Sequence, residues 1–255
     1  MFTKSMSNLP KLIVLFCVAL MMNTSCSSAK NQQEENEKVN NNEAFPVESE
    51  IKKDSMKNNT KVLISTTLGD ITIILYEETP QHRDNFIKLV NENYYDGVLF
   101  HRIIKEFMIQ TGDPDSKNAK PNVQLGMGGP GYTTPAEFVP SLYHKRGAVA
   151  AARTGDQINP KKASSGSQFY IVDGRKWTTV ELNQIAAQTG KQFSPEQIET
   201  YTTIGGVPFL DADYTVFGEV ISGMEVVDKI ASQPKDRFDR PTADIKILST
   251  KIINE

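Results

Sequence analysis

The chain has 255 residues, of which 38% are hydrophobic and 23% are charged, so it can form one globular domain with appendages. Its net charge of -3 excludes a general basic surface for nucleic acid. The 2 cysteines, Cys17 and Cys26, both lie near the start and the 3 histidines are scattered. We therefore expect neither a disulfide framework nor a metal site in the rest of the chain.

The first 25 residues have the pattern of an export signal. Lys4 and Lys11 precede the apolar run Leu12–Met22, which is shorter than the roughly 20 residues that span a bilayer. The next residues, Asn23–Ser25 and Cys26, resemble a bacterial lipobox whose first position departs from the usual leucine. We expect cleavage before Cys26 and its lipidation. The protein would then be anchored in the bacterial envelope, at the outer membrane on its periplasmic or outer side. The alternative is an ordinary secreted protein that is cleaved nearby.

Residues 26–60 form the expected tether. After Cys26 the segment is rich in Asn, Glu, Gln, Lys and Ser and has almost no apolar residues. Such a composition buries too little surface to offset the entropy cost of ordering the chain. We therefore predict a disordered spacer, followed by one domain over residues 61–255.

The domain begins with a predicted hairpin and helix. Val62–Thr67 and Asp70–Tyr76 alternate in polarity on either side of Leu68-Gly69, as the strands of a hairpin do. Thr79 is the expected helix N-cap, with Pro80 at the first helical position. His82 is expected to lie on the exposed start of this helix.

The stretch Phe100–Asp113 carries one arginine inside a largely β-forming segment. In a strand, His101 and Ile103 share the core face, whereas Arg102 and Ile104 share the opposite face. His101 is therefore expected to be a buried histidine with its hydrogen bonds satisfied. After a turn at Lys105 and Glu106, three further residues join the arginine: Phe107, Met108 and Gln110. Aimed donors beside apolar groups are typical of a small binding pocket.

Two later stretches flank this pocket in our interpretation. Gly126–Gly131 matches a dinucleotide-binding fingerprint, but no strand precedes it and prolines prevent the helix that should follow, so we predict a surface loop. Ala148–Arg153 is a predicted strand of small residues. In Ser164–Val172, alternation puts Gln168 and Tyr170 on one face and Phe169 on the other.

The last part of the chain combines helices and strands. Residues 173–208 are predicted to form a helical hairpin. Thr179 is the expected N-cap of the first helix, which ends near Gly190, and the second helix begins at a capping box, Ser194–Gln197. The remaining predicted elements are the strand Tyr214–Val220, the helix Met224–Ile230 and the strand Ile245–Ile253. Strands in this order with two short helices favour a closed antiparallel barrel of roughly eight strands.

The stretches FHRIIKEFMIQTGD, TTPAEF and SSGSQFYIV resemble cyclophilin-type peptidyl-prolyl cis-trans isomerases. The resemblance runs from about Lys61 to Ile253 and implies a cyclophilin-like barrel. Residues 173–208 have no counterpart in compact members of the family. We therefore expect an insertion there that either fills surface or selects substrates.

The family pattern implies a role for each matching residue. Arg102 would be the catalytic residue. Substrate-binding residues would be Ile104, Phe107, Met108, Gln110, Ala152, Arg153, Gln168, Tyr170, Phe209, Leu210 and Tyr214. Three of them depart from the best-known members. Phe209 stands where Trp is frequent, Tyr214 where His is frequent, and Tyr170 where Phe is frequent. We expect weak binding of cyclosporin, because Phe209 lacks an indole N–H, and a hydroxyl at the pocket floor from Tyr170.

The resemblance implies an enzyme that rotates X-Pro peptide bonds and assists the folding of envelope or secreted proteins. Rotation breaks no covalent bond, so no cofactor or metal is expected. The expected partners are proline-containing polypeptides, with membrane contact through the lipid anchor, no nucleic acid and a monomeric state. The alternatives are a non-catalytic chaperone that holds proline segments and a docking module for an assembly partner.

Overall fold

The computed structural model describes residues 60–121 and 123–253. The predicted signal peptide, Cys26 and the tether before Thr60 lie outside the described residues. In chain order the elements are β1 Lys61–Thr66, β2 Gly69–Leu75, α2 Pro80–Asn91, β3 Arg102–Ile104, β4 Met108–Thr111, η2 Pro114–Ser116, β5 Thr133–Thr134, β6 Ala148–Ala151, β7 Ser164–Ser165, β8 Phe169–Val172, α3 Thr179–Thr189, α4 Pro195–Thr203, η3 Pro208–Leu210, β9 Val216–Ser222, α5 Met224–Ala231 and β10 Ile247–Ile253. No helix among them is long and apolar enough to cross a membrane.

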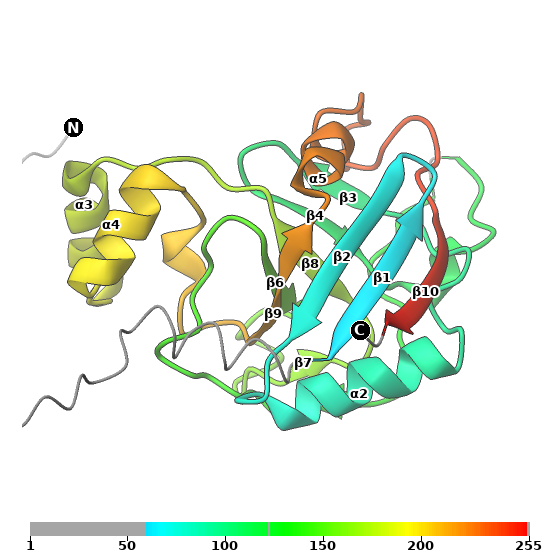
Figure 1. The fold of residues 1–255 in the computed structure, drawn as a ribbon, viewed down its shortest axis with the longest axis horizontal. Helices are drawn as coiled ribbons and strands as arrows, with labels where there is room; N and C mark the ends of the chain where they lie inside the picture. Colours follow the sequence, from blue (N-terminus) through cyan, green and yellow to red (C-terminus); the bar gives the residue numbers. More distant parts are fainter. Residues whose placement is uncertain (1–59, 122, 254–255) are drawn as a thin grey trace, which may run out of the picture. The chain divides into compact units, whose positions relative to one another are not determined.

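One 8-stranded antiparallel sheet organises the domain, with the order β10-β1-β2-β9-β6-β8-β4-β3. Its inner face holds the larger apolar core, which includes Ile64, Ile73, Phe169 and Phe217. Helices α2 and α5 lie at opposite ends of β1 and β2 (Figure 1) and both contribute residues to this core. Burial of these apolar residues is the main force that holds the sheet and its two helices together.

The predicted first helix is present, but its start differs in detail. Thr79 occupies the N-cap position and Pro80 the first turn, as expected, yet the Thr79 side chain makes no capping hydrogen bond. His82 was predicted to be exposed and is 4% exposed instead. Its Nδ1 lies 2.6 Å from Glu137 Oε2 and its Nε2 lies 2.9 Å from Ser164 Oγ. The His82 side chain is therefore buried under the segment that contains Glu137, whereas Pro80 and Gln81 before it are exposed.

The prediction of a closed barrel is wrong, because the sheet is open between its edge strands β10 and β3. The residues just before each edge strand meet at a single bridge, Leu99 with Lys246. Beyond that bridge, the Ile103 amide in β3 donates to the Asp239 carbonyl at 2.8 Å. The loop before β10 thus pairs with the edge of β3 in place of β10, and the sheet remains a half-barrel.

The four strands β3, β4, β8 and β6 place the predicted pocket residues on the outer face. Register pairs Arg102 with Gln110 and Gln110 with Tyr170. Because side chains alternate along a strand, the residues between them, Ile103 and Ile109, point into the inner core. The predicted division of faces is confirmed here.

The insertion contains the two predicted helices, and Figure 1 shows α3 and α4 beside each other at one side of the sheet. Helix α3 is capped by Thr178 rather than Thr179, through a capping box with Glu181, and ends at Gly190 in the left-handed region. Helix α4 has the predicted capping box between Ser194 and Gln197. Local capping chemistry is sufficient to define these two starts.

A close approach of two backbones fixes β4 beside β8, and it depends on Gly112. This glycine has φ +92°, and a Cβ there would lie 2.2 Å from the Ser167 carbonyl oxygen. Gly112→Ala should lower the free energy of unfolding by about 2–5 kcal/mol, since a left-handed backbone and overpacking both add cost. Urea unfolding would measure this change.

Gly97→Ala is the matched control, because Gly97 has φ +81° and nothing within 4 Å of the added Cβ. This variant should lower the free energy of unfolding by only about 1–2 kcal/mol, the cost of placing a non-glycine residue in the left-handed backbone region. Equal losses in the two variants would contradict the proposed contact with Ser167.

Candidate active site

Arg102 presents its guanidinium on the outer face of β3. The side chain is 41% exposed, and its Nε lies 3.9 Å from Asp239 Oδ2. Its Nη1 is 3.5 Å from Gln110 Oε1, and its Cζ is 5.8 Å from the centre of the Phe107 ring. These contacts orient the group but are too long to engage its donors fully. The guanidinium can therefore donate hydrogen bonds to a bound molecule.

A second apolar cluster lies beside this arginine on the outer face. Met108 and Tyr170 are 2% and 4% exposed and form its base. Partly buried side chains pack against that base, namely Ile104, Phe107, Leu142, Leu210 and Tyr214. The Phe209 ring is 5.8 Å from the Phe107 ring. Residues from β3, β4, β8 and the segment 209–214 are thus brought together as predicted.

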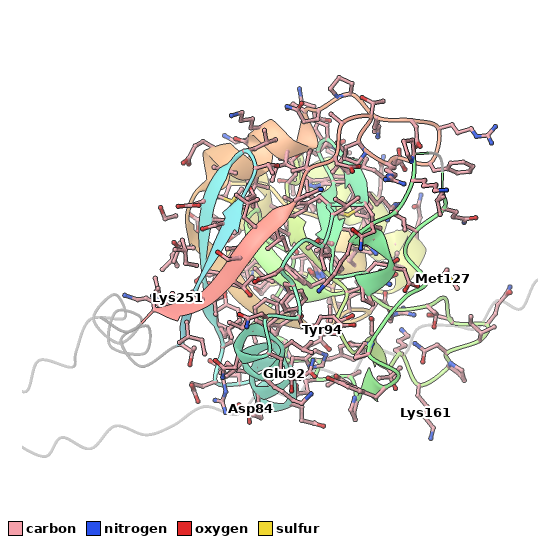
Figure 2. The ribbon with its side chains drawn as sticks, turned by 90° about the vertical axis from the view of Figure 1, so that its right-hand side faces the viewer. Asp84, Glu92, Tyr94, Met127, Lys161 and Lys251 are labelled. Carbon is pink, nitrogen blue, oxygen red and sulfur yellow. The ribbon has the colours of Figure 1, made fainter. Side chains whose placement is uncertain are left out.

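Polar groups continue from the arginine along the outer face. Gln110 Nε2 donates to Gln168 Oε1 at 3.1 Å, and Gln168 Nε2 donates to the Gly128 carbonyl at 2.8 Å. Both glutamines line a hollow of about 570 Å³, together with Ala152, Arg153 and the predicted glycine-rich loop. Met127 of that loop and Lys161 both project outward on the same side of the molecule in Figure 2. The hollow is large enough for the flank of an extended peptide.

The main chain beside this hollow is only partly available. The Ala152 amide donates to the Gln168 carbonyl at 2.9 Å, and its carbonyl accepts from the Ser165 amide at 2.7 Å. Arg153 uses its side chain to donate to the Asp213 carbonyl at 2.7 Å, with its Cζ 4.4 Å from the Tyr214 ring centre. The Arg153 side chain therefore supports Tyr214.

The Tyr170 hydroxyl is turned away from the position that the sequence indicated. It lies 2.9 Å from His144 Nε2, and that histidine is fully buried. Because Asp211 Oδ1 accepts from His144 Nδ1 at 2.9 Å, Nε2 is left to accept the tyrosine proton. Burial raises the pKa of Tyr170 well above its ordinary value. The hydroxyl is thus engaged by His144, while Tyr170 belongs to the outer-face apolar cluster.

The insertion reaches this site through the one tryptophan of the chain. Trp177 lies edge-on to Phe209, with ring centres 6.2 Å apart. Its indole N–H donates to the Gly206 carbonyl at 2.9 Å, and Arg175 stacks over the ring at 3.5 Å. The indole that approaches Phe209 therefore does not replace the donor that Phe209 lacks.

Ser164, His82 and Glu137 have the connectivity of a hydrolytic triad, and sequence spacing did not predict it. Their hydrogen bonds run from Ser164 Oγ to His82 Nε2 and from His82 Nδ1 to Glu137 Oε2. However, Ser164 is 1% exposed and His82 is 4% exposed, so no substrate can reach the hydroxyl. The three residues instead connect α2, the 134–137 segment and β7.

The glycine-rich loop and Asp113 have structural roles, as expected. No helix follows Gly126–Gly131, which excludes a dinucleotide site of the fingerprint type there. Asp113 precedes η2 and accepts from the Asp115 amide at 2.9 Å. In residues 60–121 and 123–253 no group of three or more His, Cys, Asp or Glu side chains is arranged to hold a metal.

The fold is an antiparallel half-barrel whose outer face carries an apolar cluster with one partly free arginine beside it. Residues 61–252 match the family model described as cyclophilin type peptidyl-prolyl cis-trans isomerase. The chain belongs to this family.

Individual relatives agree with the assignment. A Staphylococcus epidermidis protein named as a peptidyl-prolyl cis-trans isomerase is 33% identical over 207 residues, which cover 80% of this chain and 96% of that protein. A Streptococcus pyogenes protein named as a bifunctional phosphatase and isomerase is 36% identical over 200 residues, but these cover only 39% of its length and 76% of this chain. A cyclophilin-type isomerase from Cryptosporidium parvum superposes with TM-score 0.58 and 27% identity, over 77% of this chain and 99% of that structure.

His101 lies opposite Arg102 and gives a testable pH dependence. It is 4% exposed, as predicted, but neither ring nitrogen has a well-formed hydrogen bond, so the expectation of a satisfied histidine is wrong. Burial lowers its pKa from 6.5 to about 4, and the charge of Asp113 and the Leu99 carbonyl oppose this only in part. The unfolded chain therefore takes up a proton at higher pH than the folded chain does.

The contribution of His101 to the free energy of unfolding should be fully present above pH 6.5 and should be lost as the pH drops toward 4. The loss from this residue is on the order of 3 kcal/mol. His101→Leu should flatten the dependence in urea unfolding between these pH values, and a residual slope should remain because burial also lowers the pKa of His82. An unchanged slope in the variant would rule out His101 as the cause.

Proposed function

We propose that this protein rotates X-Pro peptide bonds in polypeptides, with Arg102 as the catalytic residue. The observation that carries the proposal is the exposed guanidinium beside Phe107 and Gln110, on the rim of an apolar cluster. The function of the family and the position of this arginine both support it.

The chemistry requires little beyond an aimed donor. The barrier to rotation is ~18–20 kcal/mol, because the nitrogen lone pair is delocalised into the carbonyl. As the bond twists, that lone pair localises on the proline nitrogen and becomes a better hydrogen-bond acceptor. A donor aimed there stabilises the transition state more than the ground state, which is the condition for catalysis. Arginine suits the task, since it is always charged and offers a rigid fork of donors.

The apolar cluster supplies the proposed proline pocket. The ring would lie on Phe107, Met108 and Leu210, with Phe209 and Tyr214 at its edges and the Tyr170 ring below. Gln110 and Gln168 would hold the main chain on one flank, and Ala152 and Arg153 would line the same flank. An extended peptide is held by main-chain hydrogen bonds of this kind, and specificity comes from the pockets beside them.

A binding chaperone remains the second candidate, because the same pocket can hold proline segments without turnover. Only the enzyme requires Arg102. In a protease-coupled assay with a proline peptide, Arg102→Ala should lose about 2–4 kcal/mol of transition-state stabilisation, or about 30- to 1000-fold in kcat/KM.

Lys105→Ala is the matched control, because Lys105 lies exposed in the turn after β3. It should retain wild-type turnover, and both variants should unfold at the wild-type urea concentration. Equal turnover by the wild-type and Arg102→Ala proteins would leave only the binding function.

We further propose that the protein is a lipoprotein of the bacterial envelope, anchored by Cys26 at the outer membrane. The support is the basic start, the short apolar run and the lipobox-like residues before Cys26. Residues 26–60 would then act as a spacer between the membrane and the domain. Its clients would be envelope or secreted proteins that contain proline, and it would act as a monomer.

Cys26→Ser should abolish incorporation of labelled palmitate and shift the protein from the membrane fraction to the soluble fraction. Isomerase activity should be unchanged, because the proposed site lies between residues 102 and 214. Cys17→Ser is the control, since that residue lies within the apolar run and should not affect labelling. Retained label in Cys26→Ser would exclude this anchor.

A further inference from the structure

A second hollow shares no lining residue with the large hollow that contains the glutamines. It has a volume of about 230 Å³ and is bounded by residues 138–143, the connector between α3 and α4, Gln197 of α4, and residues 211–216. Its apolar lining includes Phe138, Leu142, Phe193, Tyr214 and Val216. Phe138 is 40% exposed at its edge. Because the connector belongs to the insertion, the insertion supplies one wall of this hollow.

The walls of this hollow are held in place by contacts behind them. The rings of Phe193 and Tyr143 both pack edge-on against Tyr201 of α4, at 6.0 and 5.7 Å between ring centres. Tyr201 is fully buried and donates to Asp211 Oδ2 at 2.7 Å. A site whose walls are already ordered loses less entropy when a ligand binds.

Two polar side chains at the edge of the hollow, Lys191 and Gln197, already have partners. Lys191 Nζ lies 2.5 Å from both Asp213 Oδ2 and the Asp211 carbonyl. The Gln197 side chain accepts from the Ser194 amide at 2.8 Å in the capping box. What remains available to a ligand is therefore mainly the apolar lining, which favours an uncharged occupant.

The hollow is continuous with the apolar cluster of the proposed proline pocket. Leu142, Tyr214 and Val216 line the hollow and also belong to, or pack against, the cluster that contains Met108 and Tyr170. The Tyr214 ring is 6.0 Å from the Tyr170 ring. A peptide whose proline lies on this cluster therefore has neighbouring residues within reach of the second hollow.

The volume indicates the size of the occupant. Sites for whole small molecules are typically about 300–1,000 Å³. A hollow of about 230 Å³ is smaller than this and suits a single large apolar side chain. Several of its walls are aromatic, and aromatic rings pack favourably against one another in edge-on or offset arrangements.

We propose that this hollow is a subsite for one aromatic or large aliphatic side chain of the polypeptide substrate, close in sequence to the proline. None of its lining residues borders the hollow that contains Gln110 and Gln168. The insertion thus selects clients that have a bulky apolar residue at one position beside an X-Pro bond. This inference rests on the proposed isomerase function and specifies its substrate class.

The test is a set of short X-Pro peptides in which one phenylalanine is moved through the positions on either side of the X-Pro pair, in an otherwise alanine background. The all-alanine peptide is the reference. Wild-type protein should show about a tenfold gain in kcat/KM at one position on one flank, as burial of much of an aromatic side chain predicts. Phe138→Ala should remove most of that gain and leave turnover of the reference peptide unchanged.

Leu248→Ala is the matched control, since Leu248 is 55% exposed on the edge strand β10, outside both hollows. It should keep the tenfold gain. A second measurement does not depend on variants: methyl NMR signals of Val139, Leu142 and Val216 should shift when the preferred peptide is added, and less with the reference peptide.

The outcomes separate the two proposals. If the wild-type protein does not turn over the reference peptide, the proposed function fails. Normal turnover with no preferred position, or with a preference that Phe138→Ala retains, overturns the subsite alone. Shifts of the three methyl signals with protein concentration in the absence of peptide would assign the hollow to contact between copies of this chain, and would also overturn the subsite.

Discussion

The antiparallel pairing of β3, β4 and β8 is the constraint on which the site depends. It places Arg102, Gln110 and Tyr170 in one row across three strands. The intervening residues Ile103, Ile109 and Ile171 are fully buried on the inner face. A register shift of one residue would exchange the two faces, burying the guanidinium and exposing three isoleucines. The energy of the core therefore also fixes the position of the arginine.

The insertion is part of the same structural unit, and Asp211 is the residue that connects it. One carboxylate oxygen accepts from the His144 side chain below Tyr170, and the other accepts from Tyr201 of α4. Asp211 directly follows Phe209 and Leu210, so these contacts also locate the segment that borders the proposed proline pocket. Trp177 packs against Phe209 from the same side. An added segment thus supports one wall of the site that the shared fold provides.

Much of the fold and of the site followed from local patterns in the sequence. Alternation in 100–113 and 164–172 predicted which side chains share a face, and capping boxes predicted the helices of the insertion. The predictions that failed concern groups whose partners are distant in the chain. His82 is covered by Glu137, 55 residues away, and the Tyr170 hydroxyl is engaged by His144, 26 residues away. The prediction of a closed barrel also failed, because the loop before β10 pairs with the edge of β3. No periodicity within one segment encodes contacts of this kind.

The loop that keeps the half-barrel open has a protective consequence. Unpaired edges of a sheet are templates on which other extended chains can add, and a protein that handles unfolded polypeptides meets many such chains. Here the Asp239 carbonyl takes up the Ile103 amide, while Gly97 and Val98 exchange hydrogen bonds with Ile247 at the start of β10. Lys235 also donates to the Ile103 carbonyl. At these positions a passing chain finds no free backbone groups on which it could add as a further strand.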